Sequence, residues 1–317
     1  MIEISIIGAG NVGSLLTYLM NRSYVYPRLV FKRDRVAEDM YLENIDGRRA
    51  ILRYKPVVYD DYENWIYSDI IVIATKAYDA ESIIRDISAR IPRNKEELLV
   101  VVTQNGLKIL EIAAELIGPD KISQLVLNQG VHRINSNTFR WIGGSQSYLG
   151  MLKGYRNKYL EIFKDLLREI NIEVVEDIQP YRWLKLAVNA VINPITAIMR
   201  ARNKIIVENS YIKDLIARKI CEEVEEVARR NSIEMPADPY EEVIKIARST
   251  GDNYSSMLSD VLNCKRTEID YINGAVIEYG LRRGFKPIYN EILYYMVKAQ
   301  EETCHAREDL AKTLYKS

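Results

Sequence analysis

The hydrophobic pattern of this 317-residue chain changes near residue 178, and the change limits the folds open to it. Before that point, short apolar runs alternate with amphipathic stretches of helical period, which is typical of a doubly wound α/β domain. After it, only segments of helical period remain. A chain of this length also exceeds one typical hydrophobic core. We therefore predict a doubly wound α/β domain over residues 1–177 and an all-helical domain over residues 178–317.

The apolar runs of the first domain consist largely of Ile and Val, which indicates strands buried on both faces, as in a parallel sheet. The predicted strands are 2–7, 29–31, 57–59, 70–75, 98–103, 122–127 and 172–175, with a few short antiparallel strands between 132 and 152. The predicted helices include 79–91, 107–117 and 160–170 in the first domain and 183–200, 211–230, 239–248, 254–262, 267–283 and 288–299 in the second.

Composition narrows the class of partner. The 44 basic residues balance 44 acidic ones, so no overall field favours nucleic acid or an anionic membrane. No apolar run approaches the ~20 residues that span a bilayer. The N-terminus also lacks the pattern of a signal peptide. We therefore expect a soluble cytoplasmic protein.

Cysteine and histidine usage is consistent with that expectation. Cys221, Cys264 and Cys304 are widely separated and odd in number, which fits a reducing compartment without disulfide bonds. We expect Cys264 to be an ordinary thiol. The chain has two histidines and no Cys-x-x-Cys pair, so a zinc site is not expected.

A glycine-rich turn follows the first predicted strand and precedes a helical pattern. Gly8 permits the tight turn, Gly10 lets a pyrophosphate approach, and Gly13 lets helix and strand pack closely. The helix N-terminus then presents N–H groups to the phosphates. The alternative is a plain glycine turn. The residues expected to contact a dinucleotide here are Gly8, Ala9, Gly10, Asn11, Val12 and Gly13.

The end of the second strand bears on the choice of dinucleotide. NAD-binding proteins usually place an acidic residue there, whereas a basic residue accommodates the 2′-phosphate of NADP. The sequence reads Lys32-Arg33-Asp34. Lys32 and Arg33 favour NADP(H), and the adjacent Asp34 leaves NAD(H) possible. A charged surface loop is the alternative interpretation.

Two further strand ends carry polar residues. Lys76 follows the fourth strand and Asn105 follows the fifth. Ligands bind beyond the carboxyl ends of parallel strands, so both side chains are candidates for contact near a nicotinamide. The alternatives are an exposed surface lysine and a simple Asn105-Gly106 turn.

A polar stripe runs along the predicted helix 183–200. Lys185, Asn189 and Asn193 are spaced by four and separated by apolar residues, so they share one face of an otherwise apolar helix. Buried Lys and Asn side chains are costly unless they are paired. The stripe therefore indicates a pocket in which a polar ligand supplies partners. The alternative is that Lys185 pairs with a buried carboxylate for structural reasons.

Together these segments resemble the ketopantoate reductase family, within the 6-phosphogluconate-dehydrogenase-like superfamily, over essentially the whole chain. That family has an N-terminal Rossmann-type domain and a helical C-terminal domain. The matching segments are the glycine turn, Thr75-Lys76, Gln104-Asn105-Gly106, the segment from Lys185 to Pro194, Ser255-Ser-Met-Leu258 with Asp260, and Thr267-Glu-Ile-Asp-Tyr-Ile-Asn-Gly274. The lysine-asparagine helix and the last segment are the most specific.

The resemblance implies roles for individual residues. Lys185 corresponds to the family's general acid, and Glu268 to its active-site carboxylate. Lys76, Asn105 and Glu268 are also implied at the cofactor. Gln104 stands where some relatives have histidine, with little expected consequence. The positions implied to hold substrate are Asn105, Asn189, Asn193, Asn203 and Ser256.

Two of these residues also have ordinary structural explanations. Glu268 falls in the first turn of the predicted helix 267–283, where a carboxylate interacts favourably with the helix dipole. Ser255 and Ser256 begin another predicted helix, where serine is a common N-cap.

The resemblance implies an NADPH-dependent oxidoreductase that reduces 2-dehydropantoate (ketopantoate) to (R)-pantoate, on the route to pantothenate and coenzyme A. The cofactor carries the hydride, and a buried lysine with a lowered pKa can donate the proton. A homodimer is expected. Two alternatives stay open: a related NAD(P)-dependent dehydrogenase of another 2-oxo or 3-hydroxy acid, and a regulator that senses NADPH without turnover.

Overall fold

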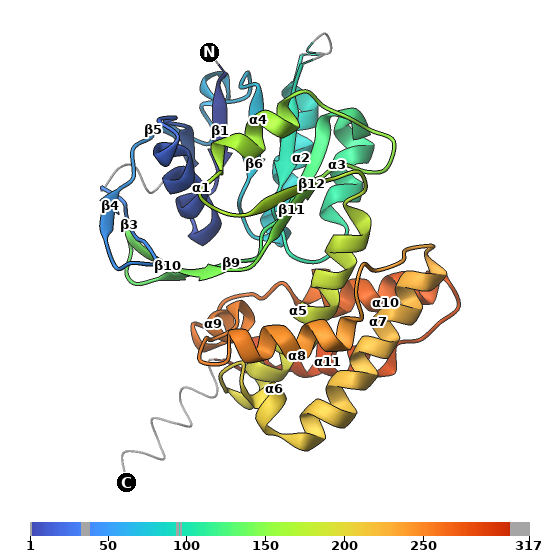
Figure 1. The fold of residues 1–317 in the computed structure, drawn as a ribbon. Coiled ribbons are helices and arrows are strands. Elements are labelled where there is room, and N and C mark those ends of the chain that lie inside the picture. Colours follow the sequence, from blue (N-terminus) through green and yellow to red (C-terminus); the bar gives the residue numbers. More distant parts are fainter. Residues whose placement is uncertain (1, 33–38, 93–94, 96, 305–317) are drawn as a thin grey trace. The chain divides into compact units, whose positions relative to one another are not determined.

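The computed structural model describes residues 2–32, 39–92, 95 and 97–304. The chain divides into two compact units (Figure 1). The first unit comprises Met1–Gln104 and Ile109–Ile178, and the second comprises Asn105–Lys108 and Gln179–Ser317. The short segment Asn105–Lys108 thus packs with the helical unit, although the sequence pattern places it in the α/β domain.

An eight-stranded sheet forms the centre of the first unit. Six adjacent strands of this sheet are parallel, and across the sheet they follow the order β5-β2-β1-β6-β7-β8. Numbered by their place in the chain, these strands lie in the order 3-2-1-4-5-6, which is the Rossmann order. At the other edge, β11 is antiparallel to β8 and parallel to β12. This confirms the predicted α/β class. In spatial order the strands are β12 (Ile172–Val175), β11 (Ser147–Gly150), β8 (Ile122–Val126), β7 (Leu99–Val102), β6 (Ile70–Ile73), β1 (Ile4–Ile7), β2 (Arg28–Phe31) and β5 (Lys55–Val58).

The central strands lie where the Ile- and Val-rich runs predicted them. Every residue of β1, β6, β7 and β8 is buried, as expected for strands covered on both faces. Helices α2 and α3 pack against each other, and α1 contacts strands of a second sheet. The helices of this unit are α1 (Asn11–Arg22), α2 (Ala77–Arg90), α3 (Ile109–Ile117) and α4 (Tyr159–Leu166).

The second sheet of this unit has four strands, in the order β4-β3-β10-β9. β9 (Gln129–Arg133) and β10 (Thr138–Gly144) form an antiparallel pair. β3 (Tyr41–Glu43) and β4 (Arg49–Ile51) were not predicted. Each has only three residues, and β4 has no buried residue, so neither leaves a hydrophobic pattern in the sequence.

The described part of the second unit is helical throughout. α5 is its centre: most of its residues are buried, and it contacts α7, α8, α9 and α11. The predicted all-helical class is confirmed, and the short α6 is an addition. The elements are α5 (Gln179–Met199), α6 (Ile205–Glu208), the π-helix η3 (Tyr211–Ala217), α7 (Arg218–Arg230), α8 (Pro239–Ser249), α9 (Ser256–Leu262), the 3-10 turn η4 (Ile269–Tyr271), α10 (Asn273–Arg282) and α11 (Ile288–Glu302).

The predicted single helix 267–283 is wrong in its first turn. Glu268 precedes the 3-10 turn η4, and α10 begins only at Asn273. The backbone N–H groups of Tyr271 and Ile272 both donate to the Glu268 carbonyl, which closes the turn early. This break could not be predicted from the sequence, because Ile269, Ile272 and Val276 keep a helical spacing across it. Glu268 is therefore not in the first turn of a long helix.

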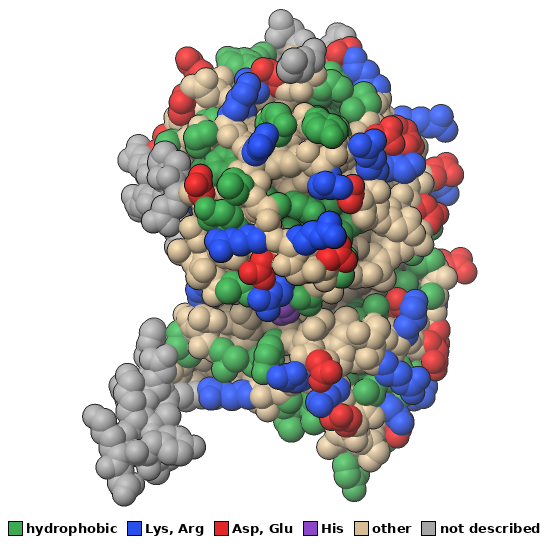
Figure 2. All heavy atoms as spheres, turned by 60° about the vertical axis from the view of Figure 1, so that its left-hand side comes forward, with side chains coloured by type: hydrophobic (Ala, Val, Ile, Leu, Met, Phe, Trp, Pro, Cys, Tyr) green, Lys and Arg blue, Asp and Glu red, His purple; other side chains and the backbone are tan. Residues whose placement is uncertain are grey.

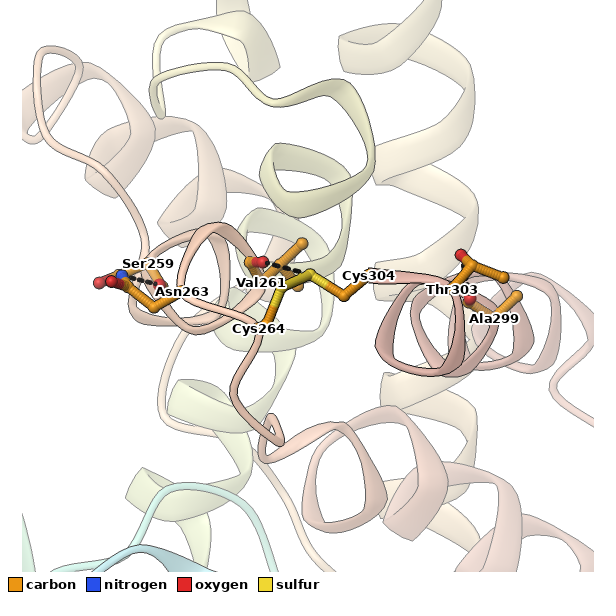
Figure 3. The surroundings of a disulfide bond; sticks show 7 residues. All are labelled: Ser259, Val261, Asn263, Cys264, Ala299, Thr303 and Cys304. Carbon is orange, nitrogen blue, oxygen red and sulfur yellow. Dashed lines mark hydrogen bonds between the residues drawn. A yellow bond between two sulfur atoms is a disulfide. The ribbon is translucent and has the colours of Figure 1, made fainter. Parts of the chain in front are cut away.

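The prediction of three free cysteines is also wrong. Cys264, just after α9, forms a disulfide bond with Cys304, just after α11 (Figure 3). Their Cα atoms lie 5.6 Å apart although 40 residues separate them in the sequence, because α10 and α11 pack against each other and bring the chain back. Cys221 is a free, buried cysteine. The cysteine count thus no longer argues for a reducing compartment.

Charged side chains of both signs lie interspersed on the face drawn in Figure 2. In the described ranges, no helix has both the length and the apolar character that crossing a bilayer requires. The same ranges hold no group of three or more His, Cys, Asp or Glu side chains arranged for a metal ion.

Candidate active site

The glycine turn after β1 has the geometry that its sequence predicts. Gly8 has φ +108°, and a Cβ on it would lie 2.9 Å from the Thr75 side chain. A Cβ on Gly13 would lie 1.9 Å from the Gly8 carbonyl oxygen, so helix α1 packs on the turn only with glycine there. Gly10 is different: no atom lies within 4 Å of its added Cβ. The space beside Gly10 is therefore open, as the close approach of a pyrophosphate requires.

Helix α1 begins directly after this open position. Its N-cap is Gly10, so no side chain covers the first N–H groups of the helix. Those groups carry the positive end of the helix dipole and favour an anion. The Asn11 amide donates to the Val131 carbonyl at 2.9 Å and ties the helix start to β9, while Ala9 and Val12 pack against the core. The residues present therefore fit a dinucleotide phosphate.

Three of the other predicted cofactor residues, Lys32, Arg33 and Lys76, follow strand ends of the first unit, whereas Asn105 and Glu268 belong to the second unit. Lys32 follows β2, is exposed, and lies 3.4 Å from a carboxylate oxygen of Asp79 in α2. Lys76 is the half-buried N-cap residue of α2. Arg33 and Asp34 lie outside the described residues, so the basic cluster at this strand end is described only through Lys32.

Gln104 has a larger structural role than the sequence suggested. Its buried amide donates to the carbonyls of Ile73 and Thr75, both at 2.9 Å, and its oxygen accepts from the Thr103 N–H at 3.1 Å. These bonds join the ends of β6 and β7 within the first unit. They hold the end of β6, which Lys76 follows in the sequence. The only sign of this role in the sequence is that Gln104 directly follows an apolar strand.

In the second unit, four predicted residues form a polar cluster: Lys185, Asn189, Asn105 and Glu268. The Asn189 amide donates to the Asn105 side-chain oxygen at 3.5 Å. The Asn105 amide in turn donates to the Glu268 carboxylate at 3.3 Å. Glu268 is only 6% exposed and interacts electrostatically with Lys185. The structure thus joins side chains that the sequence places on three separate segments.

Asn105 reaches this cluster because the segment 105–108 docks on the residues that follow Glu268. Gly106 has φ +83°, and a Cβ on it would lie 2.0 Å from the Tyr271 carbonyl oxygen. The Leu107 N–H donates to that same oxygen at 2.9 Å. Lys108 forms an ion pair with Glu278 of α10. The Asn105-Gly106 pair is therefore more than a turn, because it holds two polar side chains of the cluster together.

Burial sets the protonation of Lys185. Desolvation disfavours the charged ammonium and lowers the pKa of Lys185 to about 8, while the nearby Glu268 carboxylate raises it and so offsets part of the fall. A lysine with this pKa is largely charged at neutral pH and gives up its proton readily. Glu268 is also the kind of buried carboxylate that the structural interpretation of Lys185 requires, so both interpretations stay open.

The remaining substrate candidates lie around the later turns of α5. Asn193 is buried, and the nearby Thr196 hydroxyl is hydrogen-bonded at 2.7 Å to Ser255, the N-cap residue of α9. Ser256 is the exposed first residue of α9. Asn203 is buried and donates to the Thr250 hydroxyl at 3.0 Å, while its side-chain oxygen has no partner in the described residues. No hydrogen bond found in these residues joins Asn203 or Ser256 to the polar cluster.

Comparison with known proteins assigns both parts of the chain to one family. Residues 4–154 match the family described as ketopantoate reductase PanE/ApbA, and residues 177–301 match the family described as its C-terminal part. The 2-dehydropantoate 2-reductase of Pyrobaculum aerophilum is 35% identical over 95% of this chain and 99% of its own length.

Solved structures show the same fold at lower identity. A 2-dehydropantoate 2-reductase from Geobacter metallireducens has a TM-score of 0.84 at 22% identity, covering 94% of this chain and 99% of that one. A D-mandelate dehydrogenase, solved with NADH and anilino(oxo)acetate, has a TM-score of 0.82 at 23% identity, covering 96% of this chain and 100% of that one. With both regions matched and a relative aligned end to end, the chain belongs to the ketopantoate reductase family.

Proposed function

We propose that this protein is an oxidoreductase that reduces ketopantoate to (R)-pantoate with NADPH, with Lys185 as the proton donor. The observation that carries the proposal is the polar cluster of the second unit: a lysine with a lowered pKa beside a buried carboxylate and two amides. The relatives that are named 2-dehydropantoate 2-reductases supply the substrate class.

The first unit holds the dinucleotide. The open position at Gly10 and the uncovered N-terminus of α1 receive the pyrophosphate, with Ala9, Asn11 and Val12 lining the turn. Lys32 and Arg33 bind the 2′-phosphate that distinguishes NADPH from NADH. Lys76 contributes a positive charge at the neighbouring strand end. When bound, the nicotinamide supplies the hydride.

Lys185 supplies the proton. As the carbonyl carbon of the substrate gains a hydride, its oxygen gains negative charge, and the Lys185 Nζ ammonium stabilises that charge and then transfers one proton to it. The product is a hydroxyl, and Lys185 is left as a neutral amine. Because burial disfavours the ammonium, the transfer costs less than it would from an exposed lysine.

Glu268 and the amides select and orient the substrate. Glu268 keeps Lys185 charged at neutral pH and accepts a hydrogen bond from the 4-hydroxyl of ketopantoate. Asn105 holds Glu268 in place. The amide and hydroxyl donors proposed for the substrate carboxylate and the remaining polar atoms are those of Asn189, Asn193, Asn203 and Ser256.

A steady-state assay tests this proposal. The purified protein, given ketopantoate with NADPH or with NADH, is expected to oxidise the cofactor only when ketopantoate is present, and faster with NADPH. Tight NADPH binding without ketopantoate-dependent oxidation would reject the ketopantoate reductase. Activity with another 2-oxo acid would then support a related dehydrogenase, and no turnover with any of these acids would support the sensing regulator. Faster turnover with NADH would reject the assignment of Lys32 and Arg33.

A related 2-oxo acid dehydrogenase is the second candidate, because the D-mandelate dehydrogenase shares this fold closely. The two candidates differ in Glu268. If Glu268 recognises the 4-hydroxyl, Glu268→Gln lowers kcat/KM for ketopantoate more than for 2-oxo acids that lack this group. A wild-type protein that prefers such acids would favour the second candidate.

Three finer assignments accompany the proposal: a place on the route to pantothenate and coenzyme A, a cytoplasmic location, and a homodimer. The dimer has support from α11, where Ile288, Ile292, Tyr295 and Met296 are exposed at a helical spacing. Light scattering during size-exclusion chromatography is expected to give twice the chain mass of 36.7 kDa. Ile292→Glu is expected to shift that mass toward one chain.

A further inference from the structure

Helix α5 contains a proline that deprives one backbone carbonyl of its usual partner. Pro194 lies inside α5 and has no N–H to donate. In an α-helix, residue 194 would donate to the carbonyl of Ala190. Ala190 is completely buried, so water does not replace the missing donor. A buried carbonyl without a partner is costly, and another group must supply the bond.

That group is the side chain of Asn273. Its amide nitrogen donates to the Ala190 carbonyl oxygen at 3.1 Å, and the residue is completely buried. Asn273 is the first residue of α10, 83 residues further along the chain. It also follows η4, the turn that carries Glu268 at its start. One amide therefore links the proline turn of α5 to the segment that holds the active-site carboxylate.

A buried chain of hydrogen bonds fixes the direction of this amide. The same Asn273 nitrogen donates to the side-chain oxygen of Asn290 at 2.9 Å. The Asn290 nitrogen donates to the Glu223 carboxylate at 2.9 Å. A carboxylate only accepts, so it directs the Asn290 nitrogen toward α7 and the Asn290 oxygen toward Asn273. Asn273 must then present its nitrogen to α5.

Glu223 is itself held in place. Its carboxylate accepts the backbone N–H groups of Tyr289 and Asn290, at 2.9 and 3.0 Å, in the first turn of α11. The polar chain therefore begins at α7, passes through α11 and α10, and ends on the backbone of α5. Each donor and acceptor along it is determined by the one before.

The Ala190 carbonyl lies in the part of α5 that presents the substrate amides. Asn189 immediately precedes Ala190, and Asn193 immediately precedes Pro194. Movement of this turn changes the directions of both amides. We propose that Asn273 is a positioning residue for substrate binding: it completes the proline turn of α5 and thereby holds Asn189 and Asn193 in place. This role rests on the function proposed above for the same site.

A double-mutant cycle tests the proposal. Asn273→Leu keeps the branched shape of the side chain and removes the donor. Pro194→Ala gives residue 194 an N–H that can donate to Ala190 inside the helix, so it makes Asn273 redundant at this carbonyl. The cycle compares wild type, the two single variants and the double variant, with KM for ketopantoate and the dissociation constant of NADPH as readouts.

The expected result is a split between the two ligands. Asn273→Leu raises KM for ketopantoate about tenfold, as expected for one lost buried hydrogen bond, and leaves NADPH affinity within twofold of wild type. In the Pro194→Ala background the same change raises KM by less than threefold. The double variant still has a lower melting temperature than Pro194→Ala, because the Asn290 side-chain oxygen has lost the donor that Asn273 supplies. Recovery of KM is therefore distinguishable from recovery of stability.

Two outcomes would overturn the proposal: a folded Asn273→Leu variant with unchanged KM, or the same rise of KM in both backgrounds. If Asn273→Leu does not fold, Asn273→Ala takes its place in the cycle. If the wild-type protein does not turn over ketopantoate, the proposed function fails, and the substrate role of Asn273 fails with it. Chemical denaturation then tests only the hydrogen bond between Asn273 and the Ala190 carbonyl. If the Asn273 variant lowers the free energy of unfolding equally with Pro194 and with Ala at position 194, this hydrogen bond is rejected as well.

Discussion

The glycine turn after β1 is built from consecutive residues, whereas the polar cluster around Lys185 draws on three segments that are far apart in the sequence. The turn acts through its backbone: a positive φ, a close approach and an open position. The cluster acts through side chains, and its bond from Asn105 to Glu268 spans 163 residues. A local motif therefore specifies the proposed cofactor site, while tertiary packing specifies the proposed proton-donating site.

The largest effect is expected at Lys185. Lys185→Met removes the ammonium but keeps the apolar stem, and we expect kcat to fall by ~10²–10⁴, the usual share of a positioned general acid. NADPH affinity should stay unchanged, because Lys185 is not among the residues expected to contact the cofactor. Lys245→Met is the matched control, because Lys245 is an exposed lysine of the same unit that pairs with Glu242. Stopped-flow and steady-state rates measure both variants, and near-native turnover by Lys185→Met would exclude it as donor.

The disulfide bond offers the next contrast, because it cross-links only the helical unit. Closing a loop between residues 40 apart is worth about 4 kcal/mol in the chain-entropy account. We expect Cys264→Ser/Cys304→Ser to lower the free energy of unfolding of the second unit by about that amount, with NADPH affinity preserved. Denaturation with and without reductant measures this. A wild-type protein insensitive to reductant, and equal in stability to the variant, would contradict it.

Substitutions at two glycines of the turn distinguish an effect on backbone packing from an effect on ligand binding. Gly13→Ala places a Cβ against the Gly8 carbonyl, so we expect NADPH affinity to fall about 100-fold together with a lower melting temperature of the ligand-free protein. Gly10→Ala places its Cβ in open space, so we expect weaker NADPH binding at an unchanged ligand-free melting temperature. Isothermal titration and thermal melts decide this, and equal melting temperatures for the two variants would refute the distinction.

A smaller effect is expected at Gly106. Gly106→Ala adds a Cβ 2.0 Å from the Tyr271 carbonyl and displaces Asn105 from Glu268, so kcat/KM for ketopantoate should fall about tenfold. Gly154→Ala is the control: Gly154 also has a positive φ, but its added Cβ meets no atom within 4 Å. It shares the backbone strain without the clash, and kcat/KM should remain near wild type. Equal losses in the two variants would assign the effect to strain alone.

The same contrast explains how much the sequence could predict. Buried strands such as β6 and β7 follow from continuous Ile and Val, and the glycine turn follows from spacing within six residues. β3 and β4 could not be predicted, because each has only three residues, which is too few for a periodic pattern. Residue spacing favoured one long helix beginning at Thr267, while the backbone turns at Glu268 and restarts at Asn273.

The side-chain contacts between distant segments of the second unit could not be predicted from the residues alone. The spacing of Lys185 and Asn189 predicted their shared face but not their partners. The pairing of Asn105 with Glu268 depends on a glycine that permits backbone docking, and the Asn273 bond to Ala190 depends on a proline. The Cys264–Cys304 disulfide depends on how α10 and α11 pack. Each of these contacts depends on the three-dimensional distance between segments, which the spacing of residues along the sequence does not give.

The pH dependence of kcat/KM for ketopantoate reduction tests the role of Lys185 most directly, because kcat/KM reports groups of the free enzyme. In its proposed role Lys185 donates only while protonated, so activity should be level below its pKa of about 8 and fall tenfold per pH unit above it. Glu268 raises that pKa, so in Glu268→Gln the fall should begin at lower pH. A profile that stays level to pH 10, or a limb that Glu268→Gln does not move, would contradict Lys185 as the proton donor.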